Sequence, residues 1–345
     1  MRLLFPVAKL YETGVRLRNA LYSSGLLRIE QLRQPVISVG NLTMGGTGKT
    51  PTVIALGQLL QASGYSVSIL LKGYKGQNPG NPLLVSDGKT LLTSSRIAGD
   101  EALVIARNLP GVLVVVGKDR AQAGAWVESR FSVDAHLLDD GFQHLKLYRD
   151  LNLLLVDVAN PFGGGSLPPL GRLREPLQAI NRADAVILTR AQMDCNYQAL
   201  IQLLQGYKPG IPCLLARQQL VSAVEFGQKK SLDMGSLKGT SALAFAGIAN
   251  PFQFFNSLQD WGFQLSYRMS FPDHHRYTTR DLNRIKEKCL ERGIETVVTT
   301  EKDAENFEAS RLDPLRVVVV KIAFEFDDLE GLRKLLYSKM RVLAQ

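Results

Sequence analysis

A glycine-rich segment that ends in Lys-Thr carries the most specific chemistry in this sequence. The apolar run 35–40 is followed by Gly45-Gly46-Thr47-Gly48-Lys49-Thr50-Pro51, where a helical pattern starts. Backbone N–H groups of such a loop can close around a polyphosphate, and the helix N-terminus adds partial positive charge. Lys49 can reach the β- and γ-phosphates, and Thr50 can offer its hydroxyl to Mg²⁺. The segment therefore predicts a nucleotide site.

The strict form of this motif has glycine at position 43, where this chain has threonine. The alternative interpretation is a glycine-rich turn with a surface lysine. The order of strand, loop and helix around Lys49 favours phosphate binding over that alternative.

Two aspartates at the end of an apolar run form a candidate metal site. Asp139 and Asp140 directly follow the predicted strand Ala135–Leu138. In a phosphate-loop enzyme, an acidic strand end is where a second element holds or orients Mg²⁺, which prefers oxygen ligands. The alternative is an Asp-Gly turn that ends the strand. Together with the upstream loop the metal role is favoured, and the sequence leaves open which aspartate contacts the ion.

Asp100 and His274 are candidates for moving a proton. Asp100 opens a helical pattern, where a carboxylate can cap the helix or accept a hydroxyl proton near a transferred phosphate. On sequence alone the cap is the simpler interpretation. His274 lies in Phe271-Pro272-Asp273-His274-His275-Arg276-Tyr277, a loop in which an Asp-His pair can orient or tune a base. The alternative for His274 is a solvated loop histidine.

Three further segments have weaker interpretations. Arg120 and Arg174 each lie in a loop, where arginine can bind phosphate through two parallel hydrogen bonds, although surface arginines are common. Thr300 and Asp303 resemble a helix capping box with aspartate in the acidic position. We therefore favour a structural role for Thr300-Glu301-Lys302-Asp303.

The composition fits a reducing compartment and anionic partners. The 345 residues suffice for about two domains. Three cysteines and four histidines show no metal spacing, and the odd number of cysteines argues against a disulfide framework. The net charge of +9 suits a nucleotide, a phosphorylated substrate or an anionic membrane. Because no nucleic-acid-binding motif accompanies the basic residues, we expect no nucleic acid partner, and we infer no obligate protein partner.

The N-terminus combines basic charge with an apolar helical stripe. The stripe contains Leu3, Val7, Leu10, Leu17 and Leu21, and six basic residues through position 33 stand against Glu12 and Glu30. This pattern is typical of an amphipathic helix that lies on an anionic membrane. The alternative, which stays open, is a terminal helix packed on its own domain. The apolar stretch 3–8 is too short to span a bilayer.

The order of apolar runs and helical patterns predicts an α/β fold in two α/β/α domains, over residues 1–216 and 217–345. Such alternation is typical of a mainly parallel sheet covered by helices, with ligands beyond the C-terminal strand ends. The runs Leu83–Ser86 and Thr90–Thr93 flank Asp87-Gly88 and predict a small antiparallel hairpin with its turn there. Residues 218–238 predict a polar connector. The predicted strands are Val36–Val39, Ser66–Leu71, Val112–Val116, Ala135–Leu138, Asn152–Val156, Ala185–Thr189, Ala242–Ala246, Gln264–Met269, Thr296–Thr299 and Val317–Lys321, and the main predicted helices are Thr50–Ser63, Asp100–Asn108, Ala121–Ser129, Pro251–Trp261 and Thr279–Arg292.

The ordered set of motifs resembles the tetraacyldisaccharide 4′-kinase family over nearly the whole chain. One departure is Lys72-Gly73-Tyr74-Lys75-Gly76, where the family tends to have Arg-Gly-Tyr-Gly. Lysine keeps the charge of arginine but loses its planar fork. The matching motifs are Gly40-Asn41, residues 45–51, Gly99-Asp100-Glu101, Asp139-Asp140-Gly141-Phe142-Gln143-His144, Leu173-Arg174-Glu175-Pro176, Phe271-Pro272-Asp273-His274-His275 and Thr300-Glu301-Lys302-Asp303.

The resemblance implies a reaction and a place for it. Members of the family use ATP and Mg²⁺ to phosphorylate the 4′-hydroxyl of a tetraacylated glucosamine disaccharide 1-phosphate in lipid A synthesis. They act as peripheral proteins at the cytoplasmic face of the bacterial inner membrane. The resemblance thus implies a P-loop NTPase-like N-terminal domain, a smaller domain that closes the active-site cleft, an acylated lipid substrate and an anionic membrane surface.

The resemblance also assigns roles to residues. Asp100 matches the proposed base and His274 the assisting histidine, although the neighbouring His275 leaves that assignment open. The implied site further contains the nucleotide loop Gly45, Gly46, Thr47, Gly48, Lys49, Thr50 and Pro51, the metal set Thr50, Asp139, Asp140 and Glu175, and the possible substrate contacts Arg120 and Arg174.

A second class also has such a loop. A P-loop ATPase that works as a switch, of the partitioning or metal-insertase type, has a similar glycine pattern. That class needs a docking partner or nucleotide-dependent dimerisation rather than an acceptor pocket. ATP turnover without acceptor separates the two classes, because a kinase should then be slow.

Overall fold

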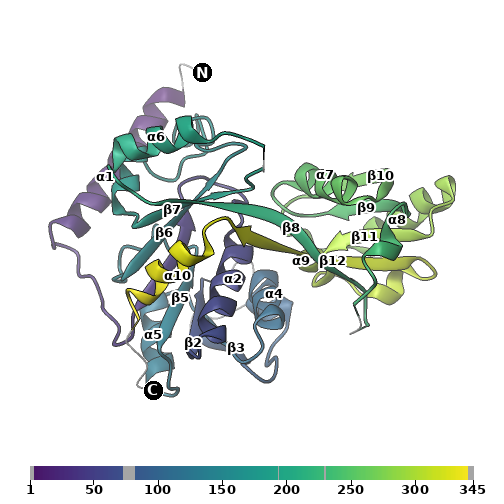
Figure 1. Ribbon diagram of the computed structural model, residues 1–345, viewed down its shortest axis with the longest axis horizontal. Helices are drawn as coiled ribbons and strands as arrows, with labels where there is room; N and C mark the ends of the chain where they lie inside the picture. Colours follow the sequence, from purple (N-terminus) through teal and green to yellow (C-terminus); the bar gives the residue numbers. More distant parts are fainter. Residues whose placement is uncertain (1–3, 73–81, 193, 229–230, 341–345) are drawn as a thin grey trace. The chain divides into compact units, whose positions relative to one another are not determined.

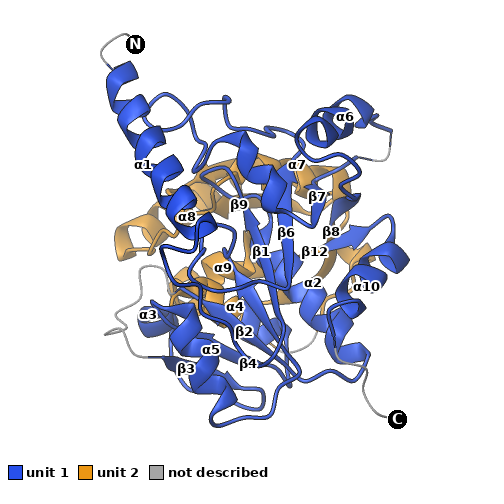
Figure 2. Ribbon diagram, turned by 90° about the vertical axis from the view of Figure 1, so that its left-hand side faces the viewer, with its two compact units in different colours: residues 1–98, 105–218, 324–345 blue, residues 99–104, 219–323 orange. Residues whose placement is uncertain are grey.

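The computed structural model describes residues 4–72, 82–192, 194–228 and 231–340. Leu3 of the apolar stripe and residues 73–76 of the Lys72 segment lie outside the described residues. The chain forms two compact units, unit 1 from residues 1–98, 105–218 and 324–345, and unit 2 from 99–104 and 219–323 (Figure 2). The chain passes into unit 2 after residue 218, while residues 99–104 belong to unit 2 and residues 324–345 to unit 1. The division into two domains at residue 216 stays a prediction.

Unit 1 contains a mostly parallel sheet in the strand order β8-β7-β6-β1-β5-β2-β4-β3. β3 pairs antiparallel with β4, whereas β1 pairs parallel with β5 and with β6. This confirms the predicted mainly parallel α/β sheet. The strands are β1 Val36–Asn41, β2 Val67–Leu71, β3 Leu83–Asp87, β4 Leu113–Val116, β5 Ala135–Asp139, β6 Leu151–Asp157, β7 Ala185–Thr189 and β8 Cys213–Glu225 (Figure 1).

The central strands of unit 1 read as continuous apolar runs because both faces of the sheet are covered. β1, β5, β6 and β7 are buried along their whole length. Parallel sheets require such cover, since helical crossovers pack on their faces. The helices are α1 Phe5–Ser23, α2 Lys49–Ala62, α3 Ser95–Ala98, α4 Asp100–Asn108, α5 Arg120–Glu128, η2 Leu177–Arg182, α6 Gln198–Tyr207 and α10 Leu329–Tyr337, and α4 is shared with unit 2.

The predicted hairpin at Asp87-Gly88 is present as a turn, but the strand expected after it is not formed. A single bridge joins Ser86 to Leu91, and β3 pairs with β4 instead. The Asp87 carboxylate accepts the N–H groups of Lys89 and Thr90 at 2.8 and 2.7 Å. These donors are therefore engaged locally and do not extend a ladder.

Unit 2 has a parallel sheet in the order β10-β9-β11-β12. Its faces are covered by apolar clusters that include Phe254 and Phe255 on one side and Phe245 in a separate cluster. The elements are β9 Ser241–Ala246, β10 Gln264–Ser270, β11 Thr296–Thr300, β12 Arg316–Phe326, α7 Pro251–Trp261, α8 Thr279–Arg292, α9 Glu301–Ala304, η3 Gly235–Leu237 and η4 Ala309–Leu312.

The predicted polar connector over residues 218–238 is partly wrong. β8 continues through this segment to Glu225. Ala223 is buried and Leu220 packs against the unit 2 core, while intervening residues are more exposed. Residues 218–225 are thus part of a half-buried strand. Gln218 and Gln219 interrupt the alternation of apolar and polar residues that would have identified it as a strand.

Helix α8 has the predicted boundaries because both of its ends are specified locally. Thr278 and Asp281 form a capping box at its start, and Gly293, at φ 62°, ends it in the left-handed region.

None of the helices in the described residues combines the length and apolar character that crossing a bilayer requires.

Candidate active site

The glycine-rich loop of unit 1 connects β1 to α2. β1 ends at Asn41 and α2 begins at Lys49. Gly48 has a φ of 85°, and a Cβ at this position would collide with the ring of Phe324. Gly45 has a φ of 119°, and a Cβ there would lie 2.6 Å from Nη2 of Arg172. Both positions therefore favour glycine for conformation, and Gly48 favours it also for space.

Two residues at the end of β7 hold this loop. Thr189 Oγ1 donates to the carbonyl of Thr47 at 3.0 Å, and Arg190 Nη2 donates to the carbonyl of Gly46 at 2.8 Å. Arg190 also forms an ion pair with Asp157 at the end of β6. Thr189 and Arg190 were not among the predicted site residues, because a Thr-Arg pair after a strand has no spacing relation to a loop 144 positions earlier.

Three predicted site residues meet at the ends of β1 and β5. Lys49 Nζ lies 3.6 Å from Asp140 Oδ1. Arg174 Nη1 donates to both oxygens of Asp140, at 2.7 and 2.9 Å. Burial alone would raise the pKa of Asp140, but the charges of Lys49 and Arg174 outweigh burial and hold this pKa below its usual value. Asp140 is thus an ionised carboxylate at the mouth of the loop.

Asp139 and Arg120 are buried near Asp140, with 4% and 6% of their surfaces exposed. Burial lowers the pKa of Arg120, and the carboxylates of Asp140 and Asp139 partly offset this effect. Arg120 therefore adds positive charge beside the two aspartates.

The oxygen atoms of Thr50, Asp139 and Asp140 fit the preference of Mg²⁺ for hard ligands. Within the described residues, no group of three His, Cys, Asp or Glu side chains is arranged to hold a metal. A nucleotide-bound Mg²⁺ typically uses one or two carboxylates together with phosphates and water. Metal binding by this set therefore stays a prediction.

Glu175, the remaining member of the predicted metal set, has protein partners. Its side chain is 1% exposed and accepts from Arg182 Nη2 at 2.8 Å and from Asn19 Nδ2 at 2.8 Å. Asn19 belongs to α1. These contacts join α1 to the loop of Glu175, and a metal role for Glu175 stays a prediction.

One side of α1 packs on unit 1, and the other side is exposed. Tyr11 Oη donates to the carbonyl of Arg174 at 3.3 Å, and Arg18 donates to the carbonyl of Gln143. On the exposed side, Leu10 and Leu17 are 75% and 59% exposed. Helix α1 is thus packed on unit 1 along one side, and docking of its exposed side on a membrane stays a prediction.

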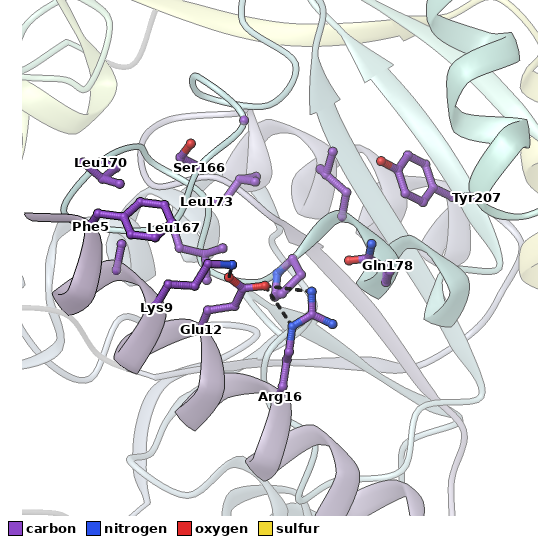
Figure 3. Close-up of a pocket in the computed structure, with 14 residues that line it drawn as sticks. Phe5, Lys9, Glu12, Arg16, Ser166, Leu167, Leu170, Leu173, Gln178 and Tyr207 are labelled. Carbon is purple, nitrogen blue, oxygen red and sulfur yellow. Dashed lines mark hydrogen bonds and ion pairs between the residues drawn. The ribbon is translucent and has the colours of Figure 1, made fainter. Parts of the chain in front are cut away.

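A pocket of about 280 Å³ opens beside α1 (Figure 3). At its edge, Glu12 pairs with Lys9 at 3.0 Å and with Arg16 at 2.7 Å. An apolar wall beside charged groups suits an amphipathic ligand. The apolar lining comes from Phe5, Ala8, Leu167, Leu170, Leu173, Pro176 and Leu177.

In unit 2, Asp100 and His274 form a hydrogen-bonded pair. His274 Nδ1 lies 3.0 Å from both carboxylate oxygens of Asp100. Asp100 is the first residue of α4 and also accepts from the N–H of Glu101 at 2.8 Å and from Asn306 Nδ2 at 3.3 Å. Burial alone would raise the pKa of Asp100, but the His274 hydrogen bond and the Lys302 charge outweigh burial and lower this pKa. An ionised carboxylate oriented by a histidine is suited to accept a proton.

The two adjacent histidines have different surroundings. His275 Nε2 lies 3.0 Å from Asp281 Oδ2, and its ring stacks on Phe271 at 4.9 Å. His274 has a φ of 58°, which is uncommon for a non-glycine residue, and its N–H donates to the carbonyl of Gly247 at 3.0 Å. This backbone turn directs His274 rather than His275 to Asp100.

The segment 300–303 has the predicted capping role and one further contact. Thr300 Oγ1 accepts the N–H of Asp303 at 3.1 Å at the start of α9. Lys302 Nζ lies 3.1 Å from His274 Nε2. Lys302 was not among the predicted site residues, because the capping motif of Thr300 and Asp303 explains this segment without it.

Comparison with known proteins identifies one family. The family model for tetraacyldisaccharide-1-P 4′-kinase, LpxK, matches residues 1–341. The tetraacyldisaccharide 4′-kinase of Pelobacter propionicus is 43% identical over 303 residues, covering 88% of this chain and 82% of the relative. That of Geobacter metallireducens is 41% identical over 297 residues, covering 85% of each.

A solved structure has the same fold. LpxK from Aquifex aeolicus, in an "apo" form in complex with ATP, matches with a TM-score of 0.77 and 34% sequence identity. The match covers 98% of each chain. The likeness therefore extends over both units.

Proposed function

This chain belongs to the tetraacyldisaccharide 4′-kinase family, and we propose that it transfers the γ-phosphate of ATP to the 4′-hydroxyl of a tetraacylated glucosamine disaccharide 1-phosphate. The observation that carries the chemical part of this proposal is the Asp100–His274 pair at 3.0 Å. The family match from residue 1 to 341 does not favour the ATPase switch, since the matching model describes a kinase.

The glycine-rich loop is proposed to bind the triphosphate. Its backbone N–H groups and the N-terminus of α2 would face the β- and γ-phosphates, with Lys49 neutralising their charge. Thr50, Asp139 and Asp140 would hold Mg²⁺, which supplies further charge neutralisation when bound. Arg174, which donates to Asp140, is proposed to contact the phosphate of the substrate. The buried Arg120 is proposed to contact the substrate as well.

Asp100 is proposed to act as the base. The 4′-oxygen of the sugar forms a bond to the γ-phosphorus, and the bond from that phosphorus to the β–γ bridging oxygen breaks. ADP leaves, and the hydroxyl proton passes to the Asp100 carboxylate, which His274 orients. The scheme requires the base and the phosphates to meet, so we propose that the smaller domain closes over the bound substrates.

The lipid part of the substrate is proposed to reach the protein through α1. Its exposed Leu10 and Leu17, together with Lys9 and Arg16, give the apolar and basic character of a helix that docks on an anionic membrane. We therefore propose a peripheral location at the cytoplasmic face of the bacterial inner membrane. The pocket beside α1 offers an apolar wall for part of an acylated substrate.

The experiment that tests this function uses the full chain with ATP, Mg²⁺ and the acylated disaccharide in mixed micelles. Mass spectrometry should show one added phosphate on the 4′ position, and ADP should form in equal amount. Rapid ATP hydrolysis without acceptor, with no phosphorylated lipid, would overturn the proposal in favour of the ATPase switch.

A further inference from the structure

We propose that Lys302 is a positioning residue that keeps the ring proton of His274 on Nδ1, so that His274 donates a hydrogen bond to Asp100. The inference deepens the proposed function, because it rests on Asp100 as the base. It concerns the ring nitrogen that faces away from Asp100.

The ammonium group of Lys302 lies among acidic groups and the His274 ring. Lys302 Nζ is 3.1 Å from His274 Nε2, 3.1 Å from Asp273 Oδ1 and 3.5 Å from Glu101 Oε1. Its side chain is 19% exposed. The contact with the ring is therefore part of a packed cluster and not a chance approach of a surface lysine.

The charge on Lys302 determines which ring nitrogen of His274 carries the proton. An ammonium group has three donors and no acceptor, so Nε2 of His274 must accept from it. A neutral imidazole then carries its proton on Nδ1, which lies 3.0 Å from Asp100. Burial alone would lower the pKa of Lys302, but the carboxylates of Glu101, Asp100 and Asp273 outweigh burial and raise it. The lysine thus stays charged.

Without Lys302, acidic groups would face the same ring nitrogen. His274 Nε2 lies 3.8 Å from Asp273 Oδ2 and 3.9 Å from Glu101 Oε1. Both carboxylates favour a second proton on the ring. A doubly protonated ring would place a positive charge against Asp100 and make that carboxylate a weaker proton acceptor. Lys302 opposes this state by its own charge.

The residue next to Lys302 holds the backbone of His274. Asp303 is buried and accepts from the N–H of Gly247 and from Tyr277 Oη, each at 2.8 Å. The carbonyl of Gly247 accepts the N–H of His274 at 3.0 Å. Two consecutive residues of α9 therefore fix the ring and the backbone of one histidine.

The test compares Lys302→Met, which removes the donor, with Lys302→Arg, which keeps a charged donor. We expect Lys302→Met to lower kcat by about 100-fold with little change in the KM for ATP. Lys302→Arg should recover most of the activity. Lys288→Met, which removes a lysine paired with Glu291 on α8, is the matched control and should behave as wild type.

A second readout does not depend on activity. With four histidines in the chain, ¹⁵N ring shifts can be assigned to His274 by comparison with His274→Gln. Wild type should show a protonated Nδ1 and an unprotonated Nε2, and Lys302→Met should show a proton on Nε2 while keeping its thermal unfolding transition. A proton on Nε2 in wild type, an unchanged kcat in Lys302→Met, or a change confined to the KM for ATP would each overturn the proposal. Failure of the wild type to phosphorylate the lipid would instead overturn the proposed function.

Discussion

His274 Nδ1 lies 3.0 Å from both oxygens of Asp100, a residue 174 positions earlier in the chain. Asp100 opens α4 and His274 follows β10, so the pair depends on the folding of unit 2. The short segment 99–104 belongs to unit 2 although it lies in the N-terminal half of the chain.

Asp100→Asn should lower kcat by about 10²- to 10⁴-fold, because the amide keeps the shape of the carboxylate but cannot accept the proton. The KM for ATP should change little, since Asp100 is not expected to bind the nucleotide. Steady-state kinetics at saturating acceptor would measure both. Asp260→Asn, at an exposed position of α7, is the matched control. An unchanged kcat in Asp100→Asn would mean that Asp100 is not the base and that its contacts with Glu101, His274 and Asn306 are structural.

Lys49→Ala should abolish transfer and weaken ATP binding while leaving the fold intact. Lys49 is expected to bind the nucleotide phosphates. Its contacts with Asp140 and Asn41 are long, at 3.6 and 3.5 Å, so their loss should cost the fold little. Calorimetric titration with ATP and a thermal unfolding scan would separate binding from folding. Lys89→Ala, an exposed lysine of the same unit, should be neutral. Full activity of Lys49→Ala would contradict the role of the loop.

Replacing both Leu10 and Leu17 by glutamate should reduce binding to vesicles that contain anionic lipid. The change removes exposed apolar area and adds negative charge on one side of α1. Co-sedimentation with vesicles would give the bound fraction of protein. The rate of phosphorylation of the acceptor in detergent micelles would show whether catalysis is preserved. Leu290→Glu, at a leucine that is 86% exposed in unit 2, is the control. Equal vesicle binding by all variants would mean that α1 is not the docking surface.

Glu128→Gln should make the stability of the protein less dependent on acid pH. Glu128 accepts the N–H of Gln34 at 2.8 Å and lies 3.3 Å from Nε2 of the buried His136. Burial alone would raise the pKa of Glu128, but the hydrogen bonds with His136, Gln34 and Arg33 outweigh it and lower this pKa to about 2. A carboxyl whose folded pKa is depressed stabilises the fold above its unfolded pKa, and this stability is lost as the pH falls toward 2.

The contribution of Glu128 should therefore be complete near pH 7, at about 3 kcal/mol at most, and should decline from about pH 4.5 downward. Urea unfolding at several pH values would show the wild type and Glu128→Gln converging as the pH falls. Glu330→Gln, at an exposed glutamate of α10, should run parallel to wild type. A constant difference between wild type and Glu128→Gln across this range would contradict the prediction.

Elements with local end signals were predictable from the sequence. The capping box of Thr278 and Asp281 and the left-handed Gly293 define α8 without reference to the rest of the fold. The parallel sheet of unit 1 was predictable because strands covered on both faces are continuously apolar. β8 was missed in part because it is half exposed, so its polar residues read as a connector.

The individual residues of the site were predictable as motifs, while most of their partners were not. Lys49, Asp140 and Arg174 each stand in a recognisable motif, but the meeting of all three is a product of strand order. Arg190 and Lys302 lie in segments with plausible structural explanations of their own. Their contacts with Gly46 and His274 depend on chain packing, which no local spacing encodes.

Helix α1 bears exposed leucines on one side and, on the other, holds the segment that contains Arg174 and Glu175 through Tyr11 and Asn19. An enzyme built in this way would search for its substrate in two dimensions. Its turnover would then follow the mole fraction of acceptor in the bilayer rather than the amount per volume of solution, and diluting the acceptor with inert lipid would slow it at constant bulk concentration.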